Sequence, residues 1–471
     1  MALRCVVLIL ATLLTAATAR AQAAGPPQPA ARSFTLGQAL QYALDHYPSV
    51  RTALEQVTIS TANADGARTA SLPRFEALWQ TNRATANNVF GQVLPQSVIP
   101  ALSGPVLPSA SAESVWGSAV GGLLSWEPFD FGLRGAVVRE AEAGIVRARA
   151  ESTLTRLAVQ TAVGTAFLAV VSAQQTVAAV DADVARRRRL AQVAQTLADN
   201  QLRPGAEASR AGAELAAAEI RVIQAGQALT IAQTRLAQLL GVPDGMVTVT
   251  TDGLVDKLAE GTVPPPLPAN HPLLQSGQAA IDLAEARESV LASTYRPRVY
   301  LQSSVFARGT GANPDGTLHG GVDGLGLERA NWAAGIQVVF PNLFDFSSLR
   351  TRRAAAGATT RAESARYDEA ALTVSTQQRI AETTVAAARA IAQHTPVQLA
   401  AARQSETQAR ARYDAGLASI VEVAEAQNLL AQAEYQDAAA RVDVWRALLA
   451  QAVAGGDVAP FTNLLRAAGV P

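Results

Sequence analysis

Histidines, cysteines and glycine-rich motifs are the features of this sequence that could carry chemistry, and they do not gather into a site. The four histidines, His46, His271, His319 and His394, are far apart, and no His-x-x-His, cysteine pair or EF-hand-like loop occurs. The glycine-rich segment 320–324 lacks the lysine of a phosphate-binding loop, and no Gly-x-Ser-x-Gly elbow stands out. We therefore expect no catalytic residue, no metal site and no cofactor, and we do not expect an enzyme.

Composition narrows the class of protein further. The 471 residues include 39 basic and 39 acidic side chains, so the charge balance gives no reason to expect a nucleic-acid partner. After the N-terminus no stretch has about 18 uninterrupted apolar residues, so we expect no transmembrane helix in the mature chain. Alanine recurs in long tracts with few prolines, which is typical of extended, closely packed helices.

The N-terminus has the pattern of a secretory leader. Arg4 supplies a positive charge, Val6 to Leu14 form an apolar stretch, and Ala21-Gln22-Ala23 fits a cleavage site. We therefore predict that residues 1–23 are a signal peptide. The only cysteine, Cys5, would be removed with it, which leaves no thiol chemistry in the mature chain.

The chain follows one plan twice. Pro48 is followed 25 residues later by Pro73, and Pro272 is followed 25 residues later by Pro297, with a proline-free segment between the members of each pair. Each segment predicts a helix that begins near one proline and stops before the next. His46 and His271 stand beside the first proline of their pair, so we expect both histidines to be structural. We interpret the recurrence as an internal repeat of about two hundred residues.

After the second proline of each pair the hydrophobic period becomes alternating, which predicts two β-hairpins, 73–132 and 297–346. Strands of about ten residues could cross a bilayer with a tilt. Aromatic residues would then lie near the membrane interfaces: Trp79, Trp116, Trp126, Trp332 and Phe340. A soluble β-sandwich is the alternative. Because four strands cannot close a barrel and open edges are costly in lipid, a membrane location would require several chains to share one barrel.

Two long proline-poor segments follow the hairpins. Residues 133–243 and 347–456 each predict a helix of about 100 Å and an antiparallel return helix, with Pro396 as the exception inside a helix. Small residues along these segments favour alanine seams between coiled helices. The remaining divisions are an N-terminal segment with short helices, an equatorial segment with a second short helix, and a C-terminal tail: 24–72, 244–296 and 457–471.

Together these landmarks resemble the TolC-like outer-membrane efflux protein family, from Leu36 to Gly456. The best-matched features are the junctions Phe129-Asp130-Phe131 and Phe344-Asp345-Phe346 and the segment 412–426. The resemblance implies a mixed α/β membrane protein: a homotrimer with four strands per chain, a shared 12-stranded transmembrane β-barrel and a long antiparallel coiled-coil α-helical barrel. It implies an outer-membrane location in a Gram-negative-type cell, with extension into the periplasm. The implied function is an exit duct for small molecules or proteins.

The resemblance also implies partners and a gate. The partners are outer-membrane lipid, a periplasmic adaptor (membrane fusion) protein and an inner-membrane transporter. The family's acidic ring at the periplasmic entrance corresponds to Glu422 and Glu425, which are spaced i, i+3 and so share a helix face. Glu207 aligns with Glu422 in the other repeat as a possible third acid. Tyr413 matches a tip tyrosine that latches neighbouring helices, whereas Ala418 stands where the family often has arginine, so we expect a weaker or different latch.

The turns between the long helices are expected to contact the adaptor. The residues concerned are Arg203, Pro204, Gly205, Asp414 and Gly416, and a glycine there would permit a positive φ at a helix end. The run Arg186 to Arg189 is expected to be a solvated face or a source of inter-helix ion pairs.

Two functions from other classes stay open at this stage. One is an enzyme built on long helices, against which the missing acid/base or metal constellation argues, and the other is a periplasmic coiled-coil structural or adaptor protein. It would explain the helices but not the four alternating strands. Within the export interpretation, neither the substrate nor the choice between drug efflux and protein secretion follows from the sequence.

Overall fold

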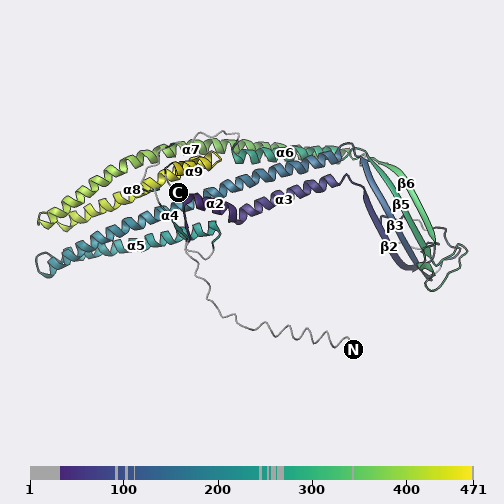
Figure 1. Cartoon of the computed structure of the whole chain (residues 1–471), viewed down its shortest axis with the longest axis horizontal. Helices are drawn as coiled ribbons and strands as arrows, with labels where there is room; N and C mark the ends of the chain where they lie inside the picture. The colour runs from purple at the N-terminus through teal and green to yellow at the C-terminus, as the bar shows by residue number, and fades with distance from the viewer. Residues whose placement is uncertain are drawn as a thin grey trace, which may run out of the picture.

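The structure is a computed structural model that describes residues 32–90, 94–100, 104–110, 112–242, 247–251, 254–255, 261, 270–341 and 344–468. The expected signal peptide and Cys5 lie outside these residues. The molecule is elongated, with a four-stranded sheet at one end and two helical hairpins reaching the other end (Figure 1).

Helices make up most of the described chain, in the order α2 (Leu36–His46), α3 (Pro48–Thr69), α4 (Leu133–Asp199), α5 (Gly205–Leu240), α6 (Pro272–Ser293), α7 (Phe346–Asp414), α8 (Ile420–Ala454) and α9 (Ala459–Ala467). The long helices α4 and α7 have 67 and 69 residues, which corresponds to about 100 Å each. Helices α3 and α6 have 22 residues each, and α5 and α8 have 36 and 35. The helix bounds therefore lie close to those expected from the proline spacing.

Both short helices of the two proline pairs begin as the sequence predicts. Pro48 and Pro272 are the first residues of α3 and α6, where the missing N–H is not needed. His271 caps α6, because its Nδ1 accepts a hydrogen bond of 3.2 Å from the backbone N–H of Leu273. His46 stacks on Tyr42 at 4.0 Å between ring centroids. The structural role expected for His46 and His271 is confirmed.

The two Phe-Asp-Phe junctions turn the chain from strand into long helix. Asp130 is 7% exposed and accepts hydrogen bonds from the backbone N–H groups of Gly132 and Arg134, and from the Arg134 guanidinium. Burial acts to raise the pKa of Asp130, but these donors lower it overall. In the second junction Asp345 accepts from the backbone N–H of Ser348 at 3.3 Å. Each aspartate thus satisfies N–H groups that a helix start leaves unpaired.

The sheet is antiparallel throughout, with the strand order β2 (Arg74–Thr85), β3 (Ser114–Phe129), β5 (Arg298–Thr310) and β6 (Arg329–Val339). The strands are 12, 16, 13 and 11 residues long, somewhat longer than the ten expected. The order places β2 and β6 at the two edges. A second sheet, missed in the sequence, pairs β1 (Arg32–Phe34) with β4 (Val247–Val249) in parallel.

One face of the four-stranded sheet is apolar and exposed. The register puts large side chains from all four strands on this face, and they are between 38% and 78% exposed: Phe75, Trp79, Leu124, Trp126, Leu301, Val305, Trp332, Ile336 and Val338. Phe340, directly after β6, is 57% exposed. Near one end of β3 the Arg83 guanidinium lies 6.0 Å from the Trp116 ring centroid, and near the other end Trp126 donates to the carbonyl of Ser71. Trp116 and Trp126 therefore lie at opposite ends of the apolar face.

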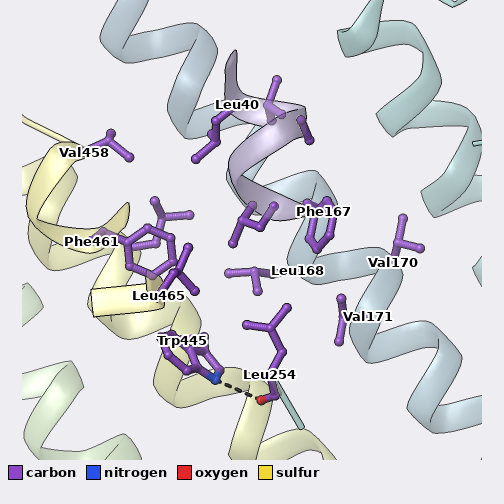
Figure 2. Close-up of a cluster of buried hydrophobic side chains, with 14 of the residues drawn as sticks. Leu40, Phe167, Leu168, Val170, Val171, Leu254, Trp445, Val458, Phe461 and Leu465 are labelled. Carbon is purple, nitrogen blue, oxygen red and sulfur yellow. Dashed lines mark hydrogen bonds between the residues drawn. The ribbon is translucent and has the colours of Figure 1, made fainter. Parts of the chain in front are cut away.

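The main hydrophobic core lies where α2, α4, α8 and α9 meet (Figure 2). Trp445 of α8 is 1% exposed, donates through Nε1 to the carbonyl of Leu254 at 2.9 Å, and meets Phe461 edge-on at 6.2 Å between centroids. Phe461 and Leu465 belong to α9, in the region that the sequence analysis treated as a tail. That region is therefore a packed helix over Ala459–Ala467.

Helix α4 contains an apolar stretch that the sequence analysis did not single out. An 18-residue window of α4 has a mean hydropathy of 1.5, enough in length and composition to cross a membrane, and 44% of it is buried inside the chain. Within α4, Val163, Phe167 and Leu168 are fully buried in the main core. Packing between helices therefore accounts for part of the apolar character of α4.

Candidate functional site

The turns of the two helical hairpins lie at the end of the molecule away from the sheet (Figure 1). Buried side chains from both hairpins form a common cluster there. Its buried members come from both hairpins: Ala194, Ala211, Tyr413, Ala418, Ile420 and Val423. We call this set the tip cluster. Alanine at 194, 211 and 418 lets the helices approach closely enough for the Tyr413 ring to be 3% exposed.

Tyr413 connects the hairpins through polar contacts as well. Its hydroxyl donates to Glu207 Oε2 at 3.3 Å, and the Arg203 guanidinium lies 5.2 Å from the centre of its ring. Arg203 also pairs with Glu207 at 3.7 Å. Burial and the neighbouring Glu207 carboxylate raise the pKa of Tyr413, so the hydroxyl keeps its proton and remains a donor. We call Arg203, Glu207 and Tyr413 the latch.

The acidic residues of the expected gate do not all come together. Glu422 and Glu425 are exposed near the start of α8, and Glu422 lies 3.8 Å from the Arg412 guanidinium. Glu207 is instead held in the latch, where its side chain is only 19% exposed. The expectation that Glu207 is a third acid of the same kind as Glu422 and Glu425 therefore does not fit its contacts within the chain. Its alignment with Glu422 did not reveal that Tyr413 and Arg203 would enclose it.

The two turns differ in backbone conformation. Gly416 has φ +75°, as expected of a glycine that follows a helix. In the other turn the residue with positive φ is Gln201 at +58°, whereas Gly205 is the first residue of α5 and does not have a positive φ. The expected role of Gly205 in the reversal is therefore wrong, because the reversal takes place directly after Asn200 and Pro204 already precedes the next helix.

Exposed residues cover the outside of both turns. Pro204, Asp414 and Gly416 are exposed, and each turn also presents a large apolar side chain, Leu202 at 69% and Leu417 at 71%. Exposed leucines at the ends of both hairpins have no partner within the described chain that would bury them. Their position at the free ends of the hairpins makes them candidate contacts for another protein.

Above the tip cluster a buried ionic network joins three helices. Arg187 of α4 is 2% exposed and contacts Asp183 at 2.8 Å, Glu214 of α5 at 2.9 Å and Asn428 of α8 at 2.7 Å. The adjacent Arg186 pairs with Glu434 of α8 at 2.7 Å.

The remainder of the arginine run lies at the surface. Arg188 makes an exposed ion pair with Glu219 at 2.9 Å, and Arg189 donates to the carbonyl of Ala185 one turn earlier. Of the two roles expected for the run, ion pairs between helices therefore apply to Arg186, Arg187 and Arg188.

No constellation for catalysis emerges from the described residues. Within them, no group of three or more histidine, cysteine, aspartate or glutamate side chains is arranged to hold a metal ion. His319 and His394 lie on different elements, a loop after β5 and helix α7. What the arrangement offers is a pair of long hairpins closed at their tips and a sheet with an exposed apolar face.

A four-stranded sheet with one apolar exposed face, carried on helices of about 100 Å, is the architecture of an outer-membrane channel protein. The family model described as outer membrane efflux protein matches residues 39–242 and 264–455, and the chain belongs to that family. It is an outer-membrane efflux channel that reaches into the periplasm.

Solved structures agree on the fold. The outer membrane protein VceC of Vibrio cholerae is 18% identical, with a TM-score of 0.70 over 90% of this chain and 96% of that one. The Campylobacter jejuni CmeC outer membrane channel is 16% identical, with a TM-score of 0.73 over 92% and 89%. The open state of the Neisseria gonorrhoeae MtrE channel is 17% identical, with a TM-score of 0.65 over 90% and 89%. No curated protein sequence matches the chain.

Proposed function

We propose that three copies of this chain assemble into one exit duct, with a shared barrel of twelve strands in the outer membrane. The observation that carries this proposal is the exposed apolar face of the sheet, bounded by the two edge strands β2 and β6. In lipid the unpaired N–H and C=O groups of those edges would cost several kcal/mol each. Pairing β6 of one protomer with β2 of the next removes both edges and leaves the apolar face toward lipid.

Exposed apolar residues on the helices support the same assembly. Ile220 and Ile223 on α5, and Leu372 and Ile380 on α7, are between 55% and 72% exposed in the single chain. Neighbouring protomers would cover them and close the hairpins 133–243 and 347–456 into a helical barrel across the periplasm. The hairpins 73–132 and 297–346 would then form the membrane part.

The tips would form the periplasmic gate. The latch ties α5 to the end of α7 within each protomer, and Glu422 and Glu425 would face the entrance as a ring of carboxylates. Such a ring favours cations and disfavours anions. Because Arg412 lies 3.8 Å from Glu422, part of the ring's charge is offset at that level. Glu425 is then the stronger determinant of cation binding.

The partners would be a periplasmic adaptor and, through it, an inner-membrane transporter that supplies the energy. The adaptor would bind the exposed turns through Leu202 and Leu417, together with the polar residues Arg203 and Asp414. Adaptor binding at these turns lies next to the latch, so it can weaken the contact between Tyr413 and Glu207 and open the entrance.

The assembly can be tested on the mature chain extracted from outer membranes in detergent. We expect a heat-modifiable trimer that gives discrete conductance steps in planar bilayers. A folded, detergent-free monomer would overturn the proposal and favour a periplasmic scaffold. For the gate, the double variant Glu422→Ala with Glu425→Ala should raise the conductance and weaken the block by multivalent cations. If conductance and block are unaltered, these glutamates do not form the gate, but the proposal of a trimeric duct still stands.

A further inference from the structure

Part of the loop between β2 and β3 lies against the sheet. Its central part, residues 94–100, runs back along the polar face of the sheet, and we call it the exit segment. Ser97 donates to Glu76 Oε2 at 2.9 Å, and Glu76 lies nine residues before Thr85, where β2 ends. At about 3.3 Å per residue, the exit segment therefore reaches about 30 Å along the strand from its outer end.

Packing fixes the exit segment to the sheet. Val98 and Ile99 are 6% and 3% exposed, and they form a cluster with Ala119 of β3 and Phe306 of β5, against which Leu78 and Leu123 pack. The strand register places these four strand residues on the face opposite the exposed apolar one. The contact is thus with the side that would face the inside of a barrel.

Gly121 shows that the sheet is shaped for this contact. A Cβ atom at Gly121 would lie 2.9 Å from Cβ of Phe306 and 3.2 Å from Cγ1 of Ile99, so a larger residue would push the exit segment away. Hydrogen bonds within the exit segment also fix its conformation. The Gln96 side chain accepts hydrogen bonds from the backbone N–H groups of Val98 and Ile99 at 2.6 and 2.7 Å, and donates to the carbonyl of Ile99 at 2.7 Å.

We propose that the exit segment lies inside the lumen of the shared barrel and sets an upper limit on the size of exported molecules. The proposal rests on the trimeric duct, since threefold symmetry would place three exit segments in one lumen. Between the segment and strands β5 and β6 there remains a hollow of about 510 Å³. That volume lies within the range of sites that hold drug-sized molecules.

Glu76, whose carboxylate binds Ser97, lies on the same face of the sheet as the hollow, but the hollow itself is lined by neutral groups. Its polar groups are the hydroxyls of Ser97 and Ser304 and the amides of Gln302 and Gln337, and none of its lining residues is ionisable. The acidic entrance at the tips would act on the charge of the substrate, and the exit segment in the lumen would act on its size. The substrate class that fits both is a small molecule that is neutral or cationic.

A thiol placed on the exit segment tests the proposal, because the only cysteine of the chain, Cys5, lies in the expected leader. Ser97 is exposed, so Ser97→Cys should react with a bulky cationic methanethiosulfonate reagent added from the outer side of a planar bilayer. We expect the conductance to fall at least twofold on labelling. Val106→Cys is the matched control, since Val106 lies in the same loop and is 77% exposed. Labelling there should leave the conductance within about a tenth of its starting value.

Ions pass the tip and the exit in series, so a closed tip could hide a change at the exit. The labelling should therefore be repeated in a Tyr413→Phe background, in which the tip is more open and the exit limits the current. Val98→Ser with Ile99→Ser should release the segment and raise the size of polyethylene glycol that enters from outside. Suppose that the trimer forms and Ser97→Cys is fully labelled in both backgrounds. Unchanged conductance would then overturn the proposal that the exit segment lies in the lumen. So would failure of that thiol to react. Absence of any trimer or any conductance step would instead overturn the proposed duct.

Discussion

The Tyr413 hydroxyl donates to Glu207 Oε2 at 3.3 Å across 206 positions of sequence, and so joins the end of α7 to the beginning of α5. The two residues belong to different hairpins, and Arg203 contacts both of them: its guanidinium pairs with Glu207 and lies against the Tyr413 ring. A change in either residue can therefore alter the position of the hairpins at the entrance without changing the contacts between the helices farther from the tips. The buried network around Arg187 holds the same hairpins together farther from the tip.

Removing the latch should increase the conductance of the channel. Tyr413→Phe keeps the ring in the tip cluster but deletes the donor, and Glu207→Gln deletes the charge that attracts Arg203. Hydrogen bonds to charged groups contribute about 1.5–3 kcal/mol, and this one is long at 3.3 Å. Each change should therefore shift the equilibrium from closed toward open by up to about tenfold. The double variant should show less than the sum of both effects, because the same contact is removed twice. Single-channel recording gives the measurement.

Tyr435→Phe is the matched control for the latch, because Tyr435 on α8 is 51% exposed and lies outside the tip cluster. Its conductance should equal that of the parent channel. Equal conductance for Tyr413→Phe and Tyr435→Phe would contradict the proposal that the Tyr413 hydroxyl helps to keep the entrance closed.

The latch should also depend on pH. The pKa of Tyr413 is raised above its ordinary value of 10.0 by burial and by Glu207, so the folded state favours the protonated hydroxyl. A raised pKa stabilises the closed tip fully below the ordinary value, and that stabilisation is lost as the pH rises through the folded-state value. Conductance should thus rise above about pH 10. Tyr413→Phe should show no such rise, and an identical alkaline rise in both channels would refute this explanation.

Much of the fold can be predicted because it depends on local signals. The absence of proline over 133–200 and the placement of Pro48 and Pro272 mark helix bounds directly. At the junctions Asp130 and Asp345 act on N–H groups within four residues, so their motif can be recognised without the rest of the chain. Strand faces follow from alternation, which fixes side-chain direction in any sheet.

The remainder depends on contacts between distant residues. Arg186 meets Glu434 over 248 positions, and nothing local separates Arg186 from the surface residue Arg188. Glu207 looks like any solvated helix residue until Tyr413 is placed beside it. The exit segment has two prolines in seven residues, as an external loop can have, and only its packing against Phe306 reveals a different position. Short elements such as α9 give too few periods to be recognised.

The buried network should contribute strongly to stability. Arg187→Met removes a guanidinium that is 2% exposed and leaves Asp183 buried with fewer partners. Removing one member of a buried ion pair typically costs about 3–5 kcal/mol. We expect a lower thermal midpoint and faster proteolysis between α4 and α5. Arg188→Met changes the adjacent residue, whose ion pair with Glu219 is exposed. It should cost less than about 1 kcal/mol, and equal effects of the two substitutions would contradict the buried role.

The cap of α6 should weaken in acid. Burial lowers the pKa of His271 from its ordinary value of 6.5, with an opposing effect from the backbone of Val453, so the folded state favours the neutral ring that accepts from Leu273. A lowered histidine pKa gives stability that is present above about pH 6.5 and is lost as the pH falls toward the folded-state value. His271→Asn keeps a capping acceptor that does not titrate. Unfolding midpoints compared at pH 7.5 and about pH 5 should fall less for His271→Asn than for the parent chain, and an equal fall would exclude His271 as the cause.

Trp445 should be the most sensitive residue of the main core, because it performs two tasks at once. Its ring fills the space between α8 and α9 against Phe461, and its Nε1 satisfies the carbonyl of Leu254 in a segment outside both helices. Trp445→Ala leaves a cavity and should cost about 3–5 kcal/mol. Trp445→Phe preserves much of the packing but leaves the Leu254 carbonyl without its donor, at about 1–3 kcal/mol. The exposed Tyr435→Ala on the same helix should cost far less. The thermal midpoint in detergent should therefore decrease most for Trp445→Ala, less for Trp445→Phe and least for Tyr435→Ala. A Phe variant as stable as the parent would show that packing alone, and not the bond to Leu254, holds this segment against the helices.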